Sequence, residues 1–529
     1  MRRKSLRAAI ALAVLCVGSG LAAQGSWAAP PAQKIPWSKC YATMGPFECG
    51  TLQVPLDYSE PQGATISLAL VRLPAGDPAN RIGSLFLNPG GPGGSGVDFT
   101  VFAGPALFTP EVRARFDLVG FDPRGIARST AVRCFGTDRQ WGPAFAPFAF
   151  PLTAEEEQFW MAADLYLVDA CAQRAGRIVD HMSTANVARD LDMLRQAVGD
   201  AKLSYYGVSY GSFLGQTYAN MFPGNFRALV IDGVLDPIAW VNTGGAIPFS
   251  TRLRSDAGAM ATLNEFFRLC DLGGNRCAAG PQSAQRYADT LQKLLDDGPV
   301  DITFPDGSGF NATYANLIGA TLGPMYDSLS WEDFAGGLAF VEGKVLGPAF
   351  AARVAPRAAL AAWRPDYITK RGFPHYYNFE GFPAVACSDS DNPASYAGWH
   401  DAAVAANAQF GYFGPLWTWV TSICAKWGGT DADRYIGPFN RTTAAPVLVV
   451  GNLFDPATRY EGAVTAHNLL PNSALLTVHG WGHTSLFISH CADTVIARYL
   501  IGVATPAPGT VCEQDHVPII AYGTPALAR

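Results

Sequence analysis

The segment around Ser209 constrains the fold more than any other part of this sequence. An apolar stretch over 203–206 predicts a β-strand, and a helix is predicted over about 212–221. Between them, residues 207–211 read Gly-Val-Ser-Tyr-Gly and match the pattern G-x-S-x-G. A serine on such a strand-to-helix turn has an exposed hydroxyl, so Ser209 is a candidate nucleophile. The alternative is an ordinary serine in a tight turn, but the flanking strand and helix favour the nucleophile.

Predicted strands and helices alternate along much of the chain. A helix over 183–199 is indicated by Ser183 or Thr184 as its cap, by apolar residues at helical spacing and by Gly199 at its end. A final helix is predicted over about 492–500. The predicted strands cover 51–58, 64–73, 84–88, 116–122, 203–206, 228–231, 446–451 and 475–478. This alternation predicts the α/β class, with a mostly parallel sheet covered by helices on both faces.

The alternation stops after Asp236 and resumes at Pro446. The interruption is rich in Trp, Tyr and Phe, and we interpret it as a large, mainly helical cap inserted between two core strands. A separate domain on flexible tethers is the alternative, but the sheet resumes immediately afterwards. The predicted segments are a signal peptide (1–28), the first part of the core (29–237), the cap (238–445) and the second part of the core (446–529).

The N-terminus has the form of an export signal. Four basic residues within the first seven precede an apolar run over 8–21, and small residues at Ser26 and Ala28 predict cleavage after Ala28. An uncleaved anchor is the alternative, but a span needs about 20 apolar residues. Removal of the four basic residues changes the formal net charge from −6 to −10. An acidic chain without basic runs gives no electrostatic reason to bind nucleic acid or anionic lipid. We expect a secreted, periplasmic or cell-envelope protein with no membrane span after cleavage.

The cysteines agree with export. Of eleven cysteines, Cys16 lies in the predicted signal and ten remain, an even number that suits an oxidising compartment. No CxxC or HExxH pattern indicates a zinc site, and no metal or organic cofactor is implied. Pairing between sequence neighbours is the simplest expectation, although the sequence allows other connectivities; it would join Cys40 to Cys49, Cys134 to Cys171, Cys270 to Cys277, Cys387 to Cys424 and Cys491 to Cys512.

A serine nucleophile needs a base and a carboxylate that orients the base. His483 follows the last predicted core strand and is therefore expected at the carboxyl edge of the sheet, unlike the other seven histidines. Asp455 follows the preceding predicted strand, in the chain order Ser, acid, His. Two competitors for the acid, Asp232 and Asp236, follow an earlier strand. A third possibility is that Asp455 only caps a turn, which is common before proline.

A glycine-rich loop over 88–96 follows an early predicted strand. Such a loop can direct main-chain N–H groups toward a substrate carbonyl and stabilise the oxyanion. We predict an oxyanion hole formed by the N–H groups of Gly91 and Tyr210, with Gly90 as the alternative to Gly91. A phosphate-binding or merely flexible loop is disfavoured because no Lys-Ser/Thr follows and no GxGxxG frame fits.

With these motifs in place, the chain resembles the tripeptidyl-aminopeptidase-like branch of the α/β-hydrolases and, more distantly, the prolyl aminopeptidases. The resemblance covers nearly all of the chain beyond the signal. It is carried by Asn-Pro-Gly-Gly-Pro-Gly at 88–93, Phe-Asp-Leu-Val-Gly-Phe-Asp-Pro-Arg-Gly at 116–125, the serine motif at 207–211 and Asp-Pro-Ala-Thr at 455–458. Arg459 departs from the proline that often follows in the family, with little effect expected on the catalytic residues.

The resemblance implies an exopeptidase that cleaves short peptides from free N-termini, with Ser209, Asp455 and His483 as the catalytic triad. Such an enzyme must bind a cationic amino terminus, and Glu380, Asp389 and Asp391 are unassigned candidates for that contact. A carboxylesterase acting on small esters with the same triad is the alternative, because the branch includes enzymes described so. A non-catalytic binding protein of this fold would need a missing triad member, and none is missing.

Overall fold

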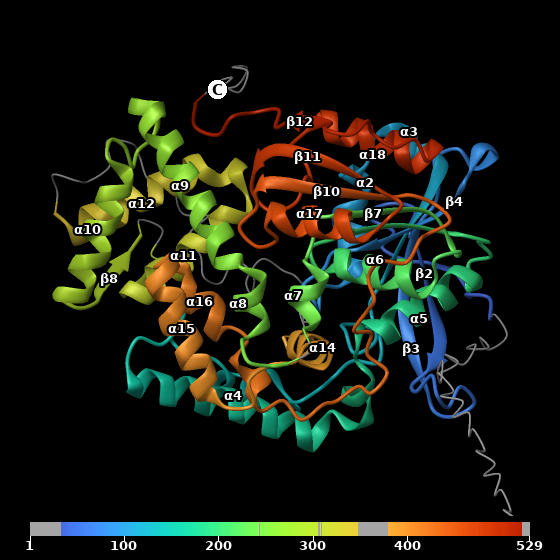
Figure 1. The fold of residues 1–529 in the computed structure, drawn as a ribbon, viewed down its shortest axis with the longest axis horizontal. Coiled ribbons are helices and arrows are strands. Elements are labelled where there is room, and N and C mark those ends of the chain that lie inside the picture. The colour runs from blue at the N-terminus through green and yellow to red at the C-terminus, as the bar shows by residue number, and fades with distance from the viewer. Residues whose placement is uncertain (1–32, 243, 305–306, 308, 348–378, 521–529) are drawn as a thin grey trace, which may run out of the picture. The chain divides into compact units, whose positions relative to one another are not determined.

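The computed structural model describes residues 33–242, 244–304, 307, 309–347 and 379–520 of the 529-residue chain. The predicted signal peptide and its cleavage site lie outside these residues. Within them, the main sheet has ten strands in the order β1-β2-β3-β5-β4-β6-β7-β10-β11-β12 (Figure 1). The strands are β1 Ser38–Lys39, β2 Glu48–Pro55, β3 Thr65–Leu73, β4 Gly83–Asn88, β5 Phe116–Phe121, β6 Leu203–Val208, β7 Phe226–Asp232, β10 Val447–Phe454, β11 Ser473–Trp481 and β12 Val511–Glu513.

The pairing of these strands confirms a mostly parallel sheet. The neighbouring strands in the sheet order β5-β4-β6-β7-β10-β11-β12 pair in parallel. Strands β1, β2 and β3 form an antiparallel edge that joins β5. Every residue of β4, β5 and β6 is buried, which fits strands covered on both faces. The eight predicted strands are all present. The short edge strands β1 and β12 were not predicted, because two or three residues carry no readable pattern.

Helices cover both faces of the sheet. On one face, apolar residues of α1 (Gly96–Phe102), α3 (Pro110–Arg115) and α18 (His490–Gly502) share a core with the strands. Helices α5 (Thr184–Ala197) and α6 (Tyr210–Met221) pack against each other, and α17 (Tyr460–Leu469) packs on β10. Helix α5 begins as predicted, because the hydroxyl of Ser183 accepts a hydrogen bond from the N–H of Asn186.

A mainly helical insertion separates β7 from β10, which are neighbours in the sheet. It has its own core, in which Phe266, Trp331 and Phe334 are fully buried and in contact. The boundaries predicted for the cap stay a prediction. The described elements are α7 Pro237–Val241, α8 Phe249–Leu253, α9 Ser255–Gly273, α10 Ser283–Asp296, the hairpin of β8 Val300–Thr303 and β9 Gly309–Ala312, α11 Tyr314–Tyr326, α12 Trp331–Val345, α14 Gly381–Asp389, α15 Tyr396–Phe410 and α16 Phe413–Trp419.

An earlier segment of the chain also packs on this insertion. Helix α4 (Ala154–Arg174) lies beside the insertion helices in Figure 1, although it precedes α5 in sequence. The indole N–H of Trp160 donates to the hydroxyl of Ser422 (3.0 Å), and Glu157 pairs with His400 at 2.7 Å. The helical layer over this end of the molecule therefore comes from two separate stretches of sequence.

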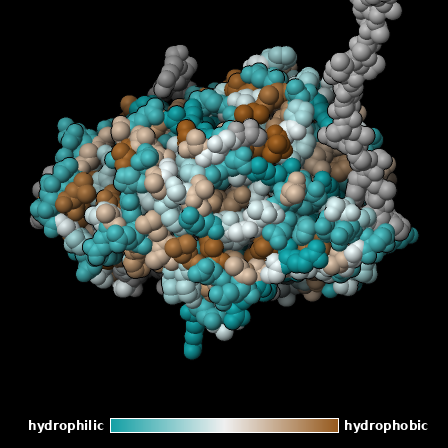
Figure 2. Space-filling view, turned by 60° about the horizontal axis from the view of Figure 1, so that its bottom comes forward, coloured by the Kyte–Doolittle hydropathy of each residue, from teal (hydrophilic) through white to brown (hydrophobic). Residues whose placement is uncertain are grey.

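All five predicted disulfides form, which confirms the pairing between sequence neighbours. Disulfides in this number are typical of proteins outside the cytoplasm. On the face shown in Figure 2, hydrophobic residues form separate small patches in a largely hydrophilic surface. In the part of the chain that the structure describes, no helix has both the length and the hydrophobicity of a membrane span.

Candidate active site

Ser209 lies at the turn between β6 and α6 in a conformation that non-glycine residues rarely adopt. Its φ is 58° and its ψ is −126°, and it is partly exposed while Val208 and Tyr210 are buried. The flanking glycines are required by space: a Cβ on Gly207 would lie 2.4 Å from the carbonyl oxygen of Gly211. The local geometry therefore has the form of a nucleophile elbow.

His483 and Asp455 form a largely buried pair beyond the ends of β11 and β10, with the imidazole 13% exposed and the carboxylate fully buried. The Nδ1 atom of His483 lies 2.9 Å and 3.0 Å from the two carboxylate oxygens of Asp455. The Asp455 side chain is fully buried and also accepts the N–H groups of Ala457 (2.9 Å), Thr458 (2.8 Å) and Thr484 (3.0 Å). Asp455 thus shapes its own turn, as the alternative interpretation held, and in addition holds the imidazole.

The electrostatics of the pair favour a charged imidazole. Burial raises the pKa of Asp455, but the charge and hydrogen bond of His483 outweigh burial and hold that pKa below its usual value. Burial conversely lowers the pKa of His483, and the carboxylate of Asp455 outweighs it and raises that pKa. Each partner therefore stabilises the ionised form of the other.

In the part of the chain that the structure describes, neither competing aspartate forms a hydrogen bond or ion pair with His483. The carboxylate of Asp236 caps helix α7 by accepting the N–H groups of Ile238 (2.8 Å) and Ala239 (3.0 Å). The carboxylate of Asp232 accepts hydrogen bonds from Ser485, two residues after His483. The position of Asp455 is the one that fits the acid of a triad.

The register of the sheet brings the segments of Ser209 and His483 to one edge. Val208 of β6 pairs with Asp232 of β7, and Asp232 pairs with Val450 of β10. The N–H of Ser209 donates to the main-chain oxygen of Asp232 at 2.9 Å, and the carboxylate of Asp232 reaches Ser485. Among the described residues, no hydrogen bond joins the Ser209 hydroxyl to His483; such catalytic hydrogen bonds often form fully only in the Michaelis complex.

The glycine-rich loop lies directly against the turn of Ser209. A Cβ on Gly90, where φ is +86°, would lie 2.7 Å from the Cβ of Ser209 and 2.9 Å from the nitrogen of Tyr210. The N–H of Gly90 is already bonded to the side-chain oxygen of Asn88 at 2.9 Å. Within the described ranges, no acceptor is recorded for the N–H of Gly91 or of Tyr210. This favours Gly91 over the alternative, Gly90, as the second oxyanion donor.

The insertion contributes a contact that the sequence did not reveal. The N–H of His483 donates to the main-chain oxygen of Tyr326 at 2.9 Å, and the two rings meet edge to face with centroids 5.0 Å apart. Tyr326 is the last residue of α11, and Asp327 forms an isolated bridge with Gly482. Because a main-chain carbonyl carries no sequence signature, only the fold could locate this contact.

The three acids considered for amine binding differ in their partners. Asp391 pairs with Arg434 at 2.6 Å. Asp389 is buried, and its two carboxylate oxygens accept hydrogen bonds from the N–H of Thr184 (2.8 Å) and from the Thr184 hydroxyl (2.6 Å). Burial raises the pKa of Asp389 to about 7. Glu380 is 5% exposed, accepts the N–H of Cys134 at 3.3 Å, and burial raises its pKa. No ion pair of Glu380 is recorded in the part of the chain described.

The strained serine, the buried His-Asp pair and the parallel sheet together define a serine hydrolase of the α/β-hydrolase fold. Comparison with known proteins agrees: residues 83–254 match the family described as alpha/beta hydrolase fold, and residues 408–512 match the family described as TAP-like protein. The chain belongs to the TAP-like family of α/β-hydrolases.

Similar proteins cover most of the chain. Serine protease Hip1 of Mycobacterium tuberculosis is 31% identical over 501 residues, 91% of each chain. Tripeptidyl aminopeptidase of Streptomyces lividans is 30% identical over 507 residues, 92% of this chain and 87% of its own. Carboxylesterase B of Mycobacterium tuberculosis is 30% identical over 482 residues, 88% of this chain and 86% of its own. These relatives are named as peptidases or as an esterase.

Proposed function

We propose that the chain is an exported serine exopeptidase that removes short peptides from free N-termini, with Ser209, His483 and Asp455 as its catalytic triad. The observation that carries the proposal is the buried pair of His483 and Asp455 at the sheet edge that also presents the strained Ser209. The five disulfides support export, and the relatives named as tripeptidyl aminopeptidases support peptide cleavage.

The proposed reaction is acyl transfer. His483 takes the proton of Ser209 as the hydroxyl attacks the scissile carbonyl, and the imidazolium then protonates the leaving amine. Water attacks the resulting ester with His483 again as the base, which releases the short N-terminal peptide with a free carboxylate and returns a proton to Ser209. The N–H groups of Gly91 and Tyr210 would hold the oxyanion in both steps. The raised pKa of His483 fits this cycle, because the imidazolium forms in each transition state.

Recognition of a free amino terminus calls for a buried carboxylate near the acyl side of the site. We assign this role to Glu380, which directly precedes α14. A Cβ on its neighbour Gly381 would lie 3.8 Å from the Cα of Gly93, in the loop that lies over the serine. Asp389 and Asp391 fit less well, because Thr184 and Arg434 already engage them.

An esterase acting on small uncharged esters is the second candidate, supported by the relative named Carboxylesterase B. Paired substrates separate the two functions: a short peptide amide with a free N-terminus, the same peptide N-acetylated, and a short-chain ester. The exopeptidase proposal expects cleavage of the free peptide to be lost on acetylation. Equal turnover of the first two, with faster turnover of the ester, would contradict it.

Glu380→Gln tests the amine contact. The substitution removes the charge but keeps the shape, so KM for the free peptide should rise about tenfold or more, as expected for loss of a charge-assisted hydrogen bond. Turnover of the ester should stay unchanged, because it carries no amine. Asp391→Asn is the matched control, since it neutralises a carboxylate of the same stretch that Arg434 already engages.

A further inference from the structure

Asp232 is a fully buried carboxylate next to the His483–Asp455 pair, and among the described residues no hydrogen bond joins its side chain to either member. Its oxygens accept the hydroxyl of Tyr206 at 2.8 Å and the hydroxyl of Ser485 at 2.6 Å. They also accept the N–H of Ser485 at 3.0 Å and 3.3 Å. Within the described ranges Asp232 has no ion pair, and a buried carboxylate without a cation is costly unless hydrogen-bond donors surround it, as Tyr206 and Ser485 do here.

Asp232 is hydrogen-bonded both to Ser209 and to the loop that carries His483. Its main-chain oxygen accepts the N–H of Ser209, which fixes the turn that presents the serine hydroxyl. Its side chain holds Ser485, two residues after His483, and thereby fixes the loop that carries the imidazole. Asp455 cannot do this, because it contacts the His483 loop but is not bonded to the segment of Ser209 in the structure.

We propose that Asp232 is a positioning residue that sets the spacing of Ser209 and His483, holding the serine through its main chain and the His483 loop through Ser485. This inference rests on the proposed function of the triad. It differs from the role of Asp455, which orients the imidazole by direct contact. Loss of the side chain would leave the His483–Asp455 bond in place but free the loop to shift relative to the serine.

The carboxylate of Asp232 also acts on the imidazole through space. The charged groups that act on His483 are Asp455 and, more weakly, Asp232, and both raise its pKa. Burial raises the pKa of Asp232 itself; its hydrogen bonds with Ser485 and Tyr206 lower it, and the nearby charge of Asp455 raises it. We therefore expect the pKa of His483 to fall when Asp232 is neutralised.

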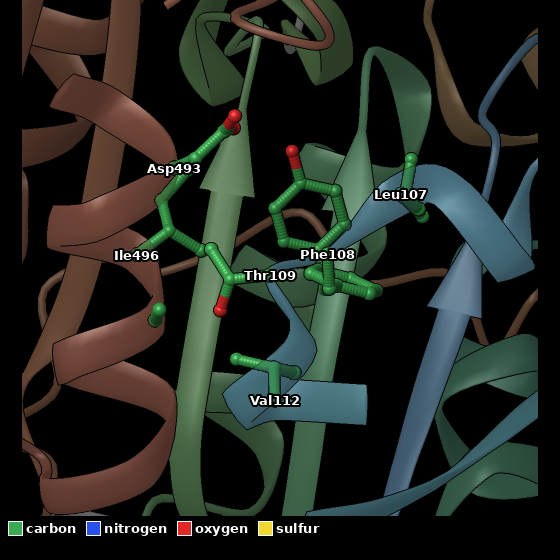
Figure 3. Close-up of a pocket in the computed structure, with 8 residues that line it drawn as sticks. Leu107, Phe108, Thr109, Val112, Asp493 and Ile496 are labelled. Carbon is green, nitrogen blue, oxygen red and sulfur yellow. The ribbon is translucent and has the colours of Figure 1, made fainter. Parts of the chain in front are cut away.

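Asp493 is a second titratable group close to the hydrogen bonds of Asp232. Tyr206, which donates to Asp232, lines a small cavity. Thr109 and Asp493 of α18 line the same cavity (Figure 3). The cavity measures about 10 Å³, room for about one water. Burial raises the pKa of Asp493 to about 6, and the charge of Asp232 contributes to this rise. Any pH profile of an Asp232 variant must therefore be compared with that of Asp493→Asn.

Asp232→Asn tests the proposal. An amide has one acceptor atom, so it must turn its NH₂ group toward a donor and lose at least one of these hydrogen bonds. We expect kcat to fall about ten- to a hundredfold with little change in KM, as for a small displacement of reacting groups. Asp236→Asn is the matched control, since it alters an aspartate four positions away that only caps α7.

Two further measurements distinguish positioning of His483 by Asp232 from a general effect of Asp232 on stability. Ser485→Ala removes one donor to Asp232, so the kcat losses of the single variants should not add in the double variant if both act through one contact. The imidazole pKa of His483, followed by NMR in histidine-labelled protein and assigned with His483→Gln, should fall in Asp232→Asn. A simple loss of stability would lower the melting temperature but not this pKa.

The outcomes separate the two proposals. If the wild-type protein hydrolyses none of the substrates, the proposed function fails, and the NMR titration still tests the effect of Asp232 on His483. If wild type is active but Asp232→Asn matches Asp236→Asn in kcat and in the pKa of His483, the role of Asp232 is wrong. Should Asp232→Asn fail to fold, a kcat of Ser485→Ala equal to that of the wild type would overturn it equally.

Discussion

The main-chain N–H of His483 donates to the main-chain oxygen of Tyr326, 2.9 Å away, so the helical insertion holds the proposed base directly. The tyrosine ring also meets the imidazole edge to face. Since Tyr326 ends α11, the position of the imidazole depends on helices that precede it by more than a hundred residues. The insertion is therefore part of the site's framework as well as a cover over it.

Tyr326→Ala should lower kcat severalfold. The main-chain bond survives, but the ring contact is lost, and such aromatic pairs contribute about 0.5–1.5 kcal/mol. Tyr326→Phe keeps the ring and should retain most of the activity. Steady-state kinetics on the free peptide measures both variants. Equal losses in the two would show that the hydroxyl, and not the ring, matters.

The pH dependence of kcat/KM should report the imidazole. A general base must be neutral in the free enzyme, so activity should fall as the pH drops through the pKa of His483. Because Asp455 raises that pKa, the acid limb should lie above about 6.5, the ordinary value for histidine. Asp455→Asn should move the limb to lower pH and reduce kcat by about 10³- to 10⁴-fold. An unchanged limb in this variant would contradict the assignment of the acid.

Asp389 should make the folded protein less stable as the pH rises. Its folded pKa, raised by burial to about 7, exceeds the value of about 3.9 in an unfolded chain. The folded state therefore binds more protons between these values, and the stability is lost as the pH rises toward and through 7. Asp389→Asn cannot ionise and should show a smaller drop in melting temperature between pH 5 and pH 8. Asp164 and Glu342, whose pKa values burial also raises, contribute equally to both proteins.

Gly90→Ala should abolish activity without unfolding the protein. The added Cβ would lie 2.6 Å from the main-chain oxygen of Val208 and 2.7 Å from the Cβ of Ser209, and the φ of +86° disfavours alanine. The loop must therefore move away from the nucleophile. Gly224→Ala, where no atom lies within 4 Å of the added Cβ, is the control and should be active. Normal activity of Gly90→Ala would refute the placement of this loop.

The parts of the fold set by local pattern could be predicted from the sequence. The serine at the cap of α5 and the glycines around Ser209 act on their own neighbours, so the boundaries of α5 and the strand-to-helix turn were predicted closely. The disulfides were predicted as well, because each joins two cysteines that are consecutive among the cysteines of the chain. The short strand β12 was missed, because it owes its conformation to pairing with β11.

The candidate site was less predictable where it depends on contacts distant in sequence. Asp232 and Asp455 both follow predicted core strands, and the sequence alone favoured Asp455 only because it follows the strand directly before that of His483. The structure separates them because one carboxylate meets the imidazole and the other meets Ser485. The contact of Tyr326 uses a main-chain atom, and the packing of α4 on the insertion joins residues more than two hundred positions apart.

The most direct test of the triad is covalent labelling of the intact protein with a fluorophosphonate, followed by mass spectrometry and peptide mapping. We expect one adduct per chain, located on Ser209, absent in Ser209→Ala and strongly slowed in His483→Gln. Labelling of another serine, or peptide hydrolysis that survives in Ser209→Ala, would contradict the account.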